Sequence, residues 1–483
     1  MVNQKRSDKH IILSSLVWKL MERLGSKGVG FIVQLLLARL LLPSDYGIVA
    51  LVLVFIEIAS VFVQSGIGTS LIQKKELDEE DITSLFYLTI AIALFLYLIF
   101  YFSAPLIASF YENRVLIKIT RVLAFSLIIN AFSTIQTALL SKEMKFKTLF
   151  IVNIISSTIS GVIGVSLAIA GYGPWALVIQ QIVRTFGVAL LLSINVKWRP
   201  KLLFSFPKVK KLYSFAWKIT LSSLVFQIYS SLVSLIIGKK FSPENLAYYN
   251  RGGTFPLFVT SNITGAIQSV LFPALAAKQD SIPQIKKMTR RSIITTSFLV
   301  FPMMVGLVVV AKPLVIIILT EKWLEVVPFI QLLSLCYWVN PILIANLQAF
   351  NALGRSDLHL KVETTRYVVG FAIIFGCSFF GLWALVIGEV VVHFLSYFIY
   401  IYPNGKLIDY GIKEQTLDIL PSLVLAAAMG IVTYLVTFLR LSNLLTLTIQ
   451  VIVGVVFYFG VAYLLKMERF IYLIEAVFPK KQN

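Results

Sequence analysis

The chain has 483 residues, of which 58% are hydrophobic and only 14% are charged. Soluble domains average about 25% charged residues, so this composition is typical of a protein that crosses a membrane many times. Two cysteines without a CxxC spacing and three scattered histidines give neither a disulfide framework nor a metal-ligand pattern.

Apolar segments follow one another along almost the whole chain. A membrane-spanning helix needs about 20 predominantly apolar residues. We therefore predict an all-α polytopic membrane protein with about 14 spans. They lie at residues 13–41, 46–70, 82–103, 117–140, 149–171, 174–195, 213–238, 253–274, 292–312, 324–350, 363–381, 382–402, 416–439 and 443–465. The connections are too short to hold a soluble domain.

The net charge of +20 does not indicate nucleic-acid binding, because the basic residues lie in short loops between apolar runs. Such residues collect on the cytoplasmic side of membrane proteins. Of the 43 lysines and arginines, 27 fall on the side of the N-terminus and 9 on the other. We therefore expect both termini to be cytoplasmic. The basic start of the chain is read as part of a retained membrane helix, since no small-residue cleavage site follows it.

The first span carries an unusual cationic and polar stripe. Its polar residues share one arc of the helix, opposite an arc of leucine, isoleucine and phenylalanine. Charges within a membrane usually face a bundle interior or a water-filled cavity. Helix geometry places Arg23, Lys27 and Gln34 at membrane depth, where they form a candidate site for an anionic group. Lys19 and Glu22 fall near the cytoplasmic mouth, where snorkelling or an ion pair within the helix is the alternative.

Later spans add further polar faces. Gln180 and Arg184 lie four residues apart in the sixth span, and Gln227 lies in a serine-rich face of the seventh. Arg251 opens the eighth span near the outer side. We predict that these residues line the cavity. Helix packing is the alternative for the serine face, and an interfacial anchor is the alternative for Arg251.

Three titratable residues within the spans are candidates for ion coupling. Glu57 is the one carboxylate near the middle of the second span, and Glu389 and His393 lie four residues apart in the twelfth. Acidic and histidine residues within membranes form proton relays, so coupling to H⁺ or Na⁺ is expected; a structural salt bridge is the alternative. The acidic run 76–81 is expected to begin a helix. No P-loop, Ser/His/Asp or metal motif is present, which argues against an ATP-driven pump and a metal site.

An internal repeat divides the chain. Gly173-Pro174-Trp175-Ala176-Leu177-Val178-Ile179 opens the sixth span, and Gly381-Leu382-Trp383-Ala384-Leu385-Val386-Ile387 opens the twelfth, with six of seven positions identical. The turn Pro43-Ser44-Asp45 is echoed by Pro243-Glu244-Asn245 in the same order. We therefore predict two six-helix lobes of one orientation around a central cavity. The predicted parts are an N-lobe over 1–195, a basic cytoplasmic linker over 196–212, a C-lobe over 213–402, and two further helices with a cytoplasmic tail over 403–483.

Two motifs carry a resemblance to a known family. Leu40-Leu41-Leu42-Pro43-Ser44-Asp45-Tyr46-Gly47 resembles the L-x-P-x-[DE]-[FY]-G turn after the first helix of polysaccharide exporters, and Ser242 to Arg251 resembles their mid-chain signature. The chain is similar to Wzx-type oligosaccharide flippases, the polysaccharide-transporter branch of the superfamily that includes multidrug (MATE) exporters and lipid II flippases. The resemblance implies undecaprenyl-pyrophosphate-linked oligosaccharide as substrate, a bacterial plasma (inner) membrane, membrane lipids as surroundings, and glycan polymerase or assembly proteins as partners.

Two alternatives remain open. A MATE-like, cation-coupled exporter of small molecules would favour an acidic cavity, whereas the stripe of the first span is net cationic. A membrane enzyme that polymerises or ligates glycans generally needs a sizeable outer loop, and the outer loops here are short. The duplicated layout and the cationic stripe therefore favour a transporter of an anionic load over either alternative.

Overall fold

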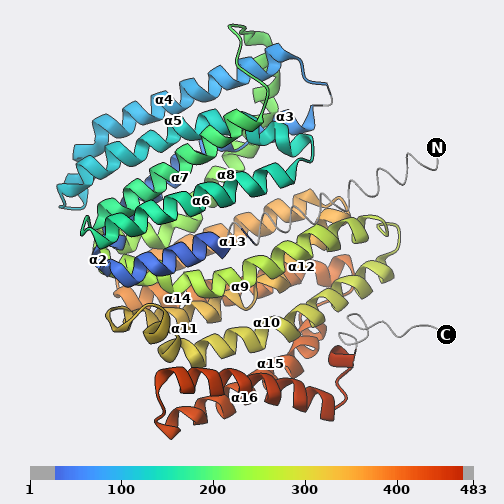
Figure 1. Ribbon diagram of the computed structural model, residues 1–483. Coiled ribbons are helices and arrows are strands. Elements are labelled where there is room, and N and C mark those ends of the chain that lie inside the picture. Colours follow the sequence, from blue (N-terminus) through green and yellow to red (C-terminus); the bar gives the residue numbers. More distant parts are fainter. Residues whose placement is uncertain (1–24, 26–27, 75, 472–483) are drawn as a thin grey trace. The chain divides into compact units, whose positions relative to one another are not determined.

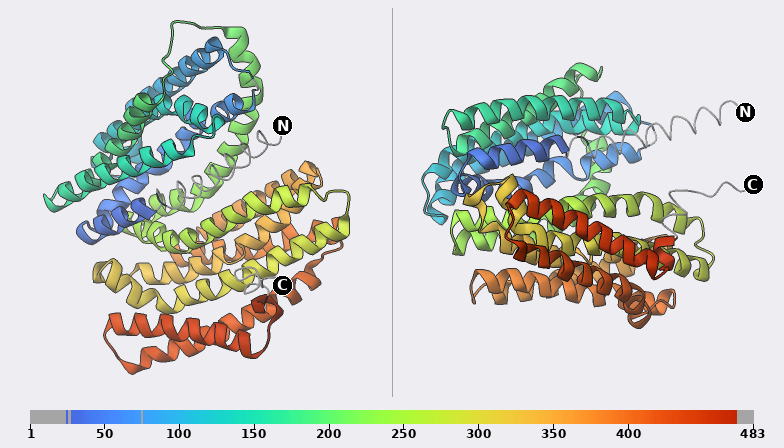
Figure 2. Two further views of the ribbon diagram at one scale, coloured as in Figure 1. Left: turned by 45° about the vertical axis from the view of Figure 1, so that its right-hand side comes forward. Right: turned by 60° about the horizontal axis from the view of Figure 1, so that its bottom comes forward.

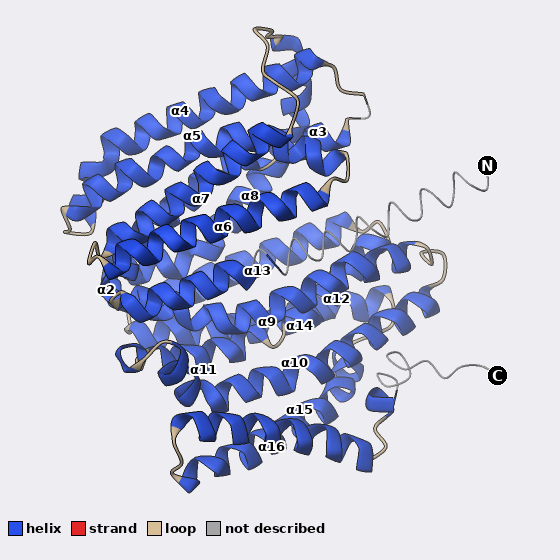
Figure 3. Cartoon of the chain, in the orientation of Figure 1, coloured by secondary structure: helices blue, strands red, loops and turns tan. Residues whose placement is uncertain are grey.

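The computed structural model describes residue 25 and residues 28–74 and 76–471. These residues form helices joined by short loops, and no strand occurs among them (Figure 3). The helices group into two compact units, Met1–Ala247 and Tyr248–Asn483 (Figure 1). The all-helical, multi-pass membrane fold predicted from composition is confirmed.

The first unit begins, within the described residues, with the short apolar helix Gly28–Leu40. Val33 of this helix packs against Gly161, where a side chain would collide with it. The helices that follow are α2 (Pro43–Gln64), α3 (Ile67–Gln73), α4 (Glu79–Phe110), α5 (Val115–Lys142), α6 (Phe146–Ile169), α7 (Pro174–Asn195) and α8 (Phe206–Lys240). The long helix α9 (Pro243–Ala276) starts in this unit and continues into the second.

The second unit is built around the long helix α10, against which α15 and α16 pack (Figure 2). Its core includes Phe298 of α10 and Tyr458 of α16, whose rings lie 4.9 Å apart between centroids. The unit comprises α10 (Ile282–Ile318), α11 (Val326–Tyr337), α12 (Asn340–Ala352), α13 (Ser356–Cys377), α14 (Leu382–Leu407), α15 (Ile412–Leu435) and α16 (Asn443–Leu464).

The expected number of 14 spans is not confirmed. Among the described residues, 12 helical segments are long and apolar enough to cross a membrane. The first predicted span, 13–41, is described only from residue 28 onward apart from residue 25, as the short helix Gly28–Leu40. The eleventh corresponds to α13, which is not among the 12 segments and whose first three turns contain Asp357, Lys361 and Arg366.

The second predicted span is interrupted near its end. Gly66 separates α2 from α3 and has a φ of 77°, which favours glycine. An added side chain would also overlap the carbonyl group of Ala216 on α8. The hydroxyl of Thr220 on α8 donates a hydrogen bond to the Ser65 carbonyl at 3.0 Å. This bond gives a partner to a carbonyl at the end of α2, where the helix itself supplies none.

Helix α8 packs within the first unit, against α2, α3 and α4. Gly238 permits the close approach, because a side chain there would collide with Leu51 of α2. The compact units therefore divide after Ala247, one helix later in the chain than the predicted linker 196–212. The sequence repeat shows where the second copy of the six-helix pattern begins. The boundary of the compact unit depends instead on which helices pack together, and α8 packs on the first unit.

The repeated motifs begin helices in both copies. Gly173 and Gly381 each precede a helix and each has a positive φ, 53° and 105°. Pro43 and Pro243 each occupy the first position of a helix, where the missing N–H costs nothing. The repeat is therefore visible as backbone geometry at both pairs of turns.

The acidic run that precedes α4 caps that helix, as predicted, and pairs with the basic linker. The carboxylate of Asp78 accepts a hydrogen bond from the Asp81 amide at 2.7 Å. Lys208 bonds to Asp78 and pairs with Glu80 at 2.6 Å, and Lys201 pairs with Glu79. The hydrogen bond from Lys208 lowers the pKa of Asp78 to about 2, so this carboxylate is ionised at neutral pH.

Candidate functional site

Four predicted site residues, Lys19, Glu22, Arg23 and Lys27, lie outside the described residues. Gln34 lies on the helix Gly28–Leu40 and is partly buried. Its backbone carbonyl accepts a hydrogen bond from the Tyr46 hydroxyl at 3.2 Å. This bond ties the helix Gly28–Leu40 to the first turn of α2.

A polar face in the first unit brings together two predicted residues. The amide nitrogen of Gln227 on α8 lies 3.5 Å from a carboxylate oxygen of Glu57 on α2, and 3.1 Å from the Ser231 hydroxyl. Glu57 is exposed at its position on α2. Helix contact between α2 and α8 therefore juxtaposes an acid, an amide and a hydroxyl, which are groups able to bind a sugar or a cation.

The two predicted residues of α7 have different surroundings. Gln180 is 6% exposed and packs over Gly164 of α6, where an added side chain would collide with it. Arg184, one turn later, is only partly buried. Among the described residues, the structure contains no hydrogen bond or ion pair from the Arg184 guanidinium. Gln180 thus contacts α6, and Arg184 remains available to an anionic ligand.

A buried polar cluster lies in the second unit. The hydroxyl of Tyr249 on α9 donates a hydrogen bond to the Glu389 carboxylate on α14 at 2.9 Å. Both side chains are less than one tenth exposed. Glu389 forms no salt bridge with any described residue. The carboxylate is therefore held by a neutral phenol, in an environment where an uncompensated charge is costly.

His393 extends this cluster by one turn of α14. Its Nδ1 atom lies 3.0 Å from the backbone carbonyl oxygen of Glu389. A carbonyl only accepts, so Nδ1 carries a proton in this contact. Tyr337 packs edge-on against the imidazole, with 5.9 Å between ring centroids. The helix spacing thus places His393 next to Glu389, but its contact is with the backbone.

Aromatic side chains enclose the cluster. Phe329 of α11 packs against both Tyr249 and Trp383. Gly252, three residues after Tyr249, allows this approach because a side chain there would collide with Phe329. Arg251 is two residues from Tyr249 on α9 and therefore on a different face of that helix; it is partly buried. The structure brings Glu389 and His393 together, but not Arg251 with them.

Tyr249 was missed as a site residue by sequence reasoning, although it lies in the mid-chain motif from Ser242 to Arg251. The tyrosine pair Tyr248-Tyr249 within that motif was the available signal. Within the described part of the chain, no group of three histidine, cysteine, aspartate or glutamate side chains is placed to hold a metal ion. The chemistry available to the cluster is the uptake and release of a proton or a small cation.

Comparison with known proteins decides the family. The family model described as "Polysaccharide biosynthesis protein" matches residues 36–328, more than half of the chain. The chain belongs to this polysaccharide biosynthesis protein family. The similarity to polysaccharide exporters predicted from the two sequence motifs is thereby confirmed.

Relatives in the family resemble most of the chain. The teichuronic acid biosynthesis protein TuaB of Bacillus subtilis (strain 168) is 24% identical over 393 residues, 78% of each chain. The lipopolysaccharide biosynthesis protein WzxC of Escherichia coli (strain K12) is 23% identical over 436 residues, 87% of this chain and 88% of its own. The similarity therefore extends well beyond the residues matched by the family model.

A solved structure shows the same fold. The lipid II flippase MurJ, in an inward closed conformation, superposes with a TM-score of 0.77 at 15% identity, covering 95% of this chain and 99% of its own. At this identity the likeness establishes the fold alone. The family member described here is thus a multi-pass membrane protein with the MurJ fold.

Proposed function

We propose that this member of the polysaccharide biosynthesis protein family is a flippase that moves an undecaprenyl-pyrophosphate-linked oligosaccharide across the plasma (inner) membrane of a bacterium. It acts as a transporter and not as an enzyme. The observation that carries the proposal is the similarity to TuaB and WzxC over more than three quarters of the chain, since both are named for the synthesis of a surface polysaccharide. The fold of a lipid II flippase supports it.

The substrate has three chemical parts, and the chain offers side chains for each. Cations of the first span, Arg23 and Lys27, together with Arg184 on α7, attract the pyrophosphate. Gln34 and Gln227 offer amides to the sugar hydroxyls, and apolar helix faces accept the polyprenyl chain. Access alternates between the two sides of the membrane as the two six-helix lobes rearrange.

Ion coupling is assigned to the cluster in the second unit. Glu389 takes up a proton or Na⁺ while Tyr249 holds its carboxylate, and release of the ion on the other side biases the conformational cycle. Glu57, next to Gln227 on the polar face of the first unit, is the second candidate carboxylate. Both chain termini lie in the cytoplasm, and glycan polymerase or assembly proteins receive the product outside.

Removing the two cations at membrane depth tests substrate binding. The variant Arg23→Ala/Lys27→Ala is expected to flip a fluorescent undecaprenyl-pyrophosphate oligosaccharide at least about a hundredfold more slowly, because hydrogen bonds to a charged partner contribute about 1.5–3 kcal/mol each. The initial rate in proteoliposomes is the measurement. Lys278→Ala/Lys287→Ala, which removes one exposed charge in the turn before α10 and one near the start of α10, is the control and should match wild type. Equal rates for all three proteins would exclude the cationic site.

A further inference from the structure

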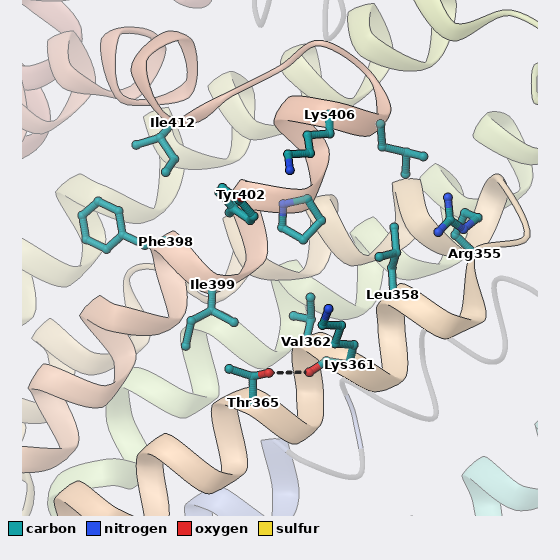
Figure 4. A pocket seen from close by; sticks show the side chains of 12 residues that line it. Arg355, Leu358, Lys361, Val362, Thr365, Phe398, Ile399, Tyr402, Lys406 and Ile412 are labelled. Atoms are coloured by element: carbon teal, nitrogen blue, oxygen red, sulfur yellow. Dashed lines mark hydrogen bonds between the residues drawn. The ribbon is translucent and has the colours of Figure 1, made fainter.

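A groove in the second unit lies apart from the residues used above. It has a volume of about 680 Å³ and lies between α13 and α14, with Ile412 at the start of α15 on one side. Its walls are mainly apolar and include Leu358, Val362, Phe398 and Ile399. Figure 4 shows these side chains around the groove, with Arg355, Lys361 and Lys406 among its lining residues. A single surface thus combines an apolar wall with a basic rim.

The apolar wall continues into a lipid-facing stripe. Phe394, Phe398 and Tyr402 follow each other at four-residue intervals on α14, and all three are exposed. Side chains at this spacing share one face of a helix. An exposed aromatic stripe on a membrane-spanning helix is solvated by acyl chains rather than by water. A lipid is therefore the molecule that meets this wall.

The basic rim carries a net positive charge. Arg355 makes two hydrogen bonds to Asp357, at 2.8 and 2.7 Å, and this contact lowers the pKa of Asp357 to about 2. The pair therefore neutralises itself. Lys361 and Lys406 form no ion pair with any described carboxylate, and Lys406 lies 5.1 Å from the centroid of the Tyr402 ring. The two ammonium groups give the rim a charge of two.

The positions of the two lysines match the depth of a headgroup. Lys361 lies near the first turns of α13 and Lys406 near the end of α14, at the same end of the unit. Figure 4 shows their ammonium groups extending into the space between the two helices. The predicted orientation places this end in the cytoplasm, where anionic headgroups attract basic pockets between helices.

We propose that this groove binds an anionic phospholipid of the cytoplasmic leaflet. Lys361 and Lys406 hold the phosphate of the headgroup, and one acyl chain lies along Leu358, Val362, Phe398 and Ile399. Charge complementarity selects an anionic over a zwitterionic lipid, and the apolar wall selects a lipid over a free phosphate. The site goes beyond the proposed flipping activity and uses none of the residues assigned to the substrate or to ion coupling.

Lipid binding to the purified full-length chain tests the proposal. Native mass spectrometry with added phosphatidylglycerol or phosphatidylcholine gives the fraction of protein that carries lipid. We expect preferential retention of phosphatidylglycerol by wild type. The variant Lys361→Gln/Lys406→Gln should lose about tenfold in apparent affinity, because each basic residue near an anionic surface contributes several-fold. Ile399→Trp, which fills the groove without changing charge, should weaken binding as well.

The control variant Lys278→Gln/Lys287→Gln removes two exposed lysines of the same unit and should bind phosphatidylglycerol as wild type does. Equal losses in both double variants would show that net charge alone attracts the lipid, and would overturn the proposal. Equal retention of phosphatidylcholine by wild type would overturn it too. Selective retention of undecaprenyl phosphate over phosphatidylglycerol would assign the groove to the polyprenyl lipid instead and would contradict the phospholipid assignment.

Discussion

Replacing Glu389 by glutamine is expected to abolish the response of transport to an imposed ion gradient, while slow movement without a gradient persists. The amide oxygen of glutamine still accepts the hydrogen bond that Tyr249 donates at 2.9 Å, so the fold around the cluster is kept. The variant loses only the ability to exchange a charge. One charge moved through 100 mV is worth about 2.3 kcal/mol. The variant therefore loses a bias of up to about fiftyfold in the distribution of the lipid between the two leaflets.

The initial rate of flipping in proteoliposomes, with and without a proton or sodium gradient, measures this effect. Glu143→Gln, at an exposed loop position, is the control and should respond to the gradient as wild type does. Glu57→Gln separates the two candidate carboxylates, because it leaves the buried cluster intact. A Glu389→Gln protein that still accelerates under the gradient would exclude this residue as the coupling group.

Replacing Gly47 by alanine is expected to destabilise the protein strongly. Gly47 lies in the first turns of α2, and an added methyl group would overlap the backbone carbonyl of Pro243 at the start of α9. Backbone cannot move aside as a flexible side chain does, so the cost of overpacking, about 1–3 kcal/mol, exceeds the helix propensity gained. The midpoint of thermal unfolding should fall by roughly 1–3 °C, because the unfolding entropy of a chain this long is about 1 kcal/mol per kelvin.

Thermal unfolding of the purified protein in detergent measures this prediction. Gly306→Ala is the matched control, since it places the same methyl group inside α10 with open space around it. This control should unfold at or slightly above the wild-type temperature, because alanine favours a helix. If Gly47→Ala proved as stable as Gly306→Ala, the close contact between the two repeated turns would be refuted.

Hydropathy and turn residues predicted most of the fold. Long apolar runs locate the membrane helices because the bilayer requires about 20 such residues whatever their neighbours are. Pro43, Pro243, Gly173 and Gly381 mark helix starts through their own backbone preferences. Such signals are local, so one sequence contains them in full.

The features that sequence reasoning missed depend on tertiary contacts. The break at Gly66 lies against α8, and Gly238 allows α8 to pack closely on α2 in the first unit. Likewise, a donor 140 positions away in the sequence, Tyr249, holds Glu389. The four-residue spacing of a helix predicted that His393 lies next to Glu389, but it could not predict the distant partner Tyr249. The carboxylates were found by residue type, and their surroundings required the packed structure.

Flipping of a defined lipid-linked oligosaccharide by the purified protein is the direct test of the proposed flippase function. Fluorescent undecaprenyl-pyrophosphate oligosaccharide is placed in one leaflet of proteoliposomes, and its arrival in the other leaflet is followed with a membrane-impermeant quencher. Wild-type protein is predicted to move the lipid faster than protein-free vesicles, and faster still under a proton or sodium gradient. Transfer no faster than in protein-free vesicles under either gradient, with export of a cationic dye by the same vesicles, would exclude the flippase function and favour a cation exporter.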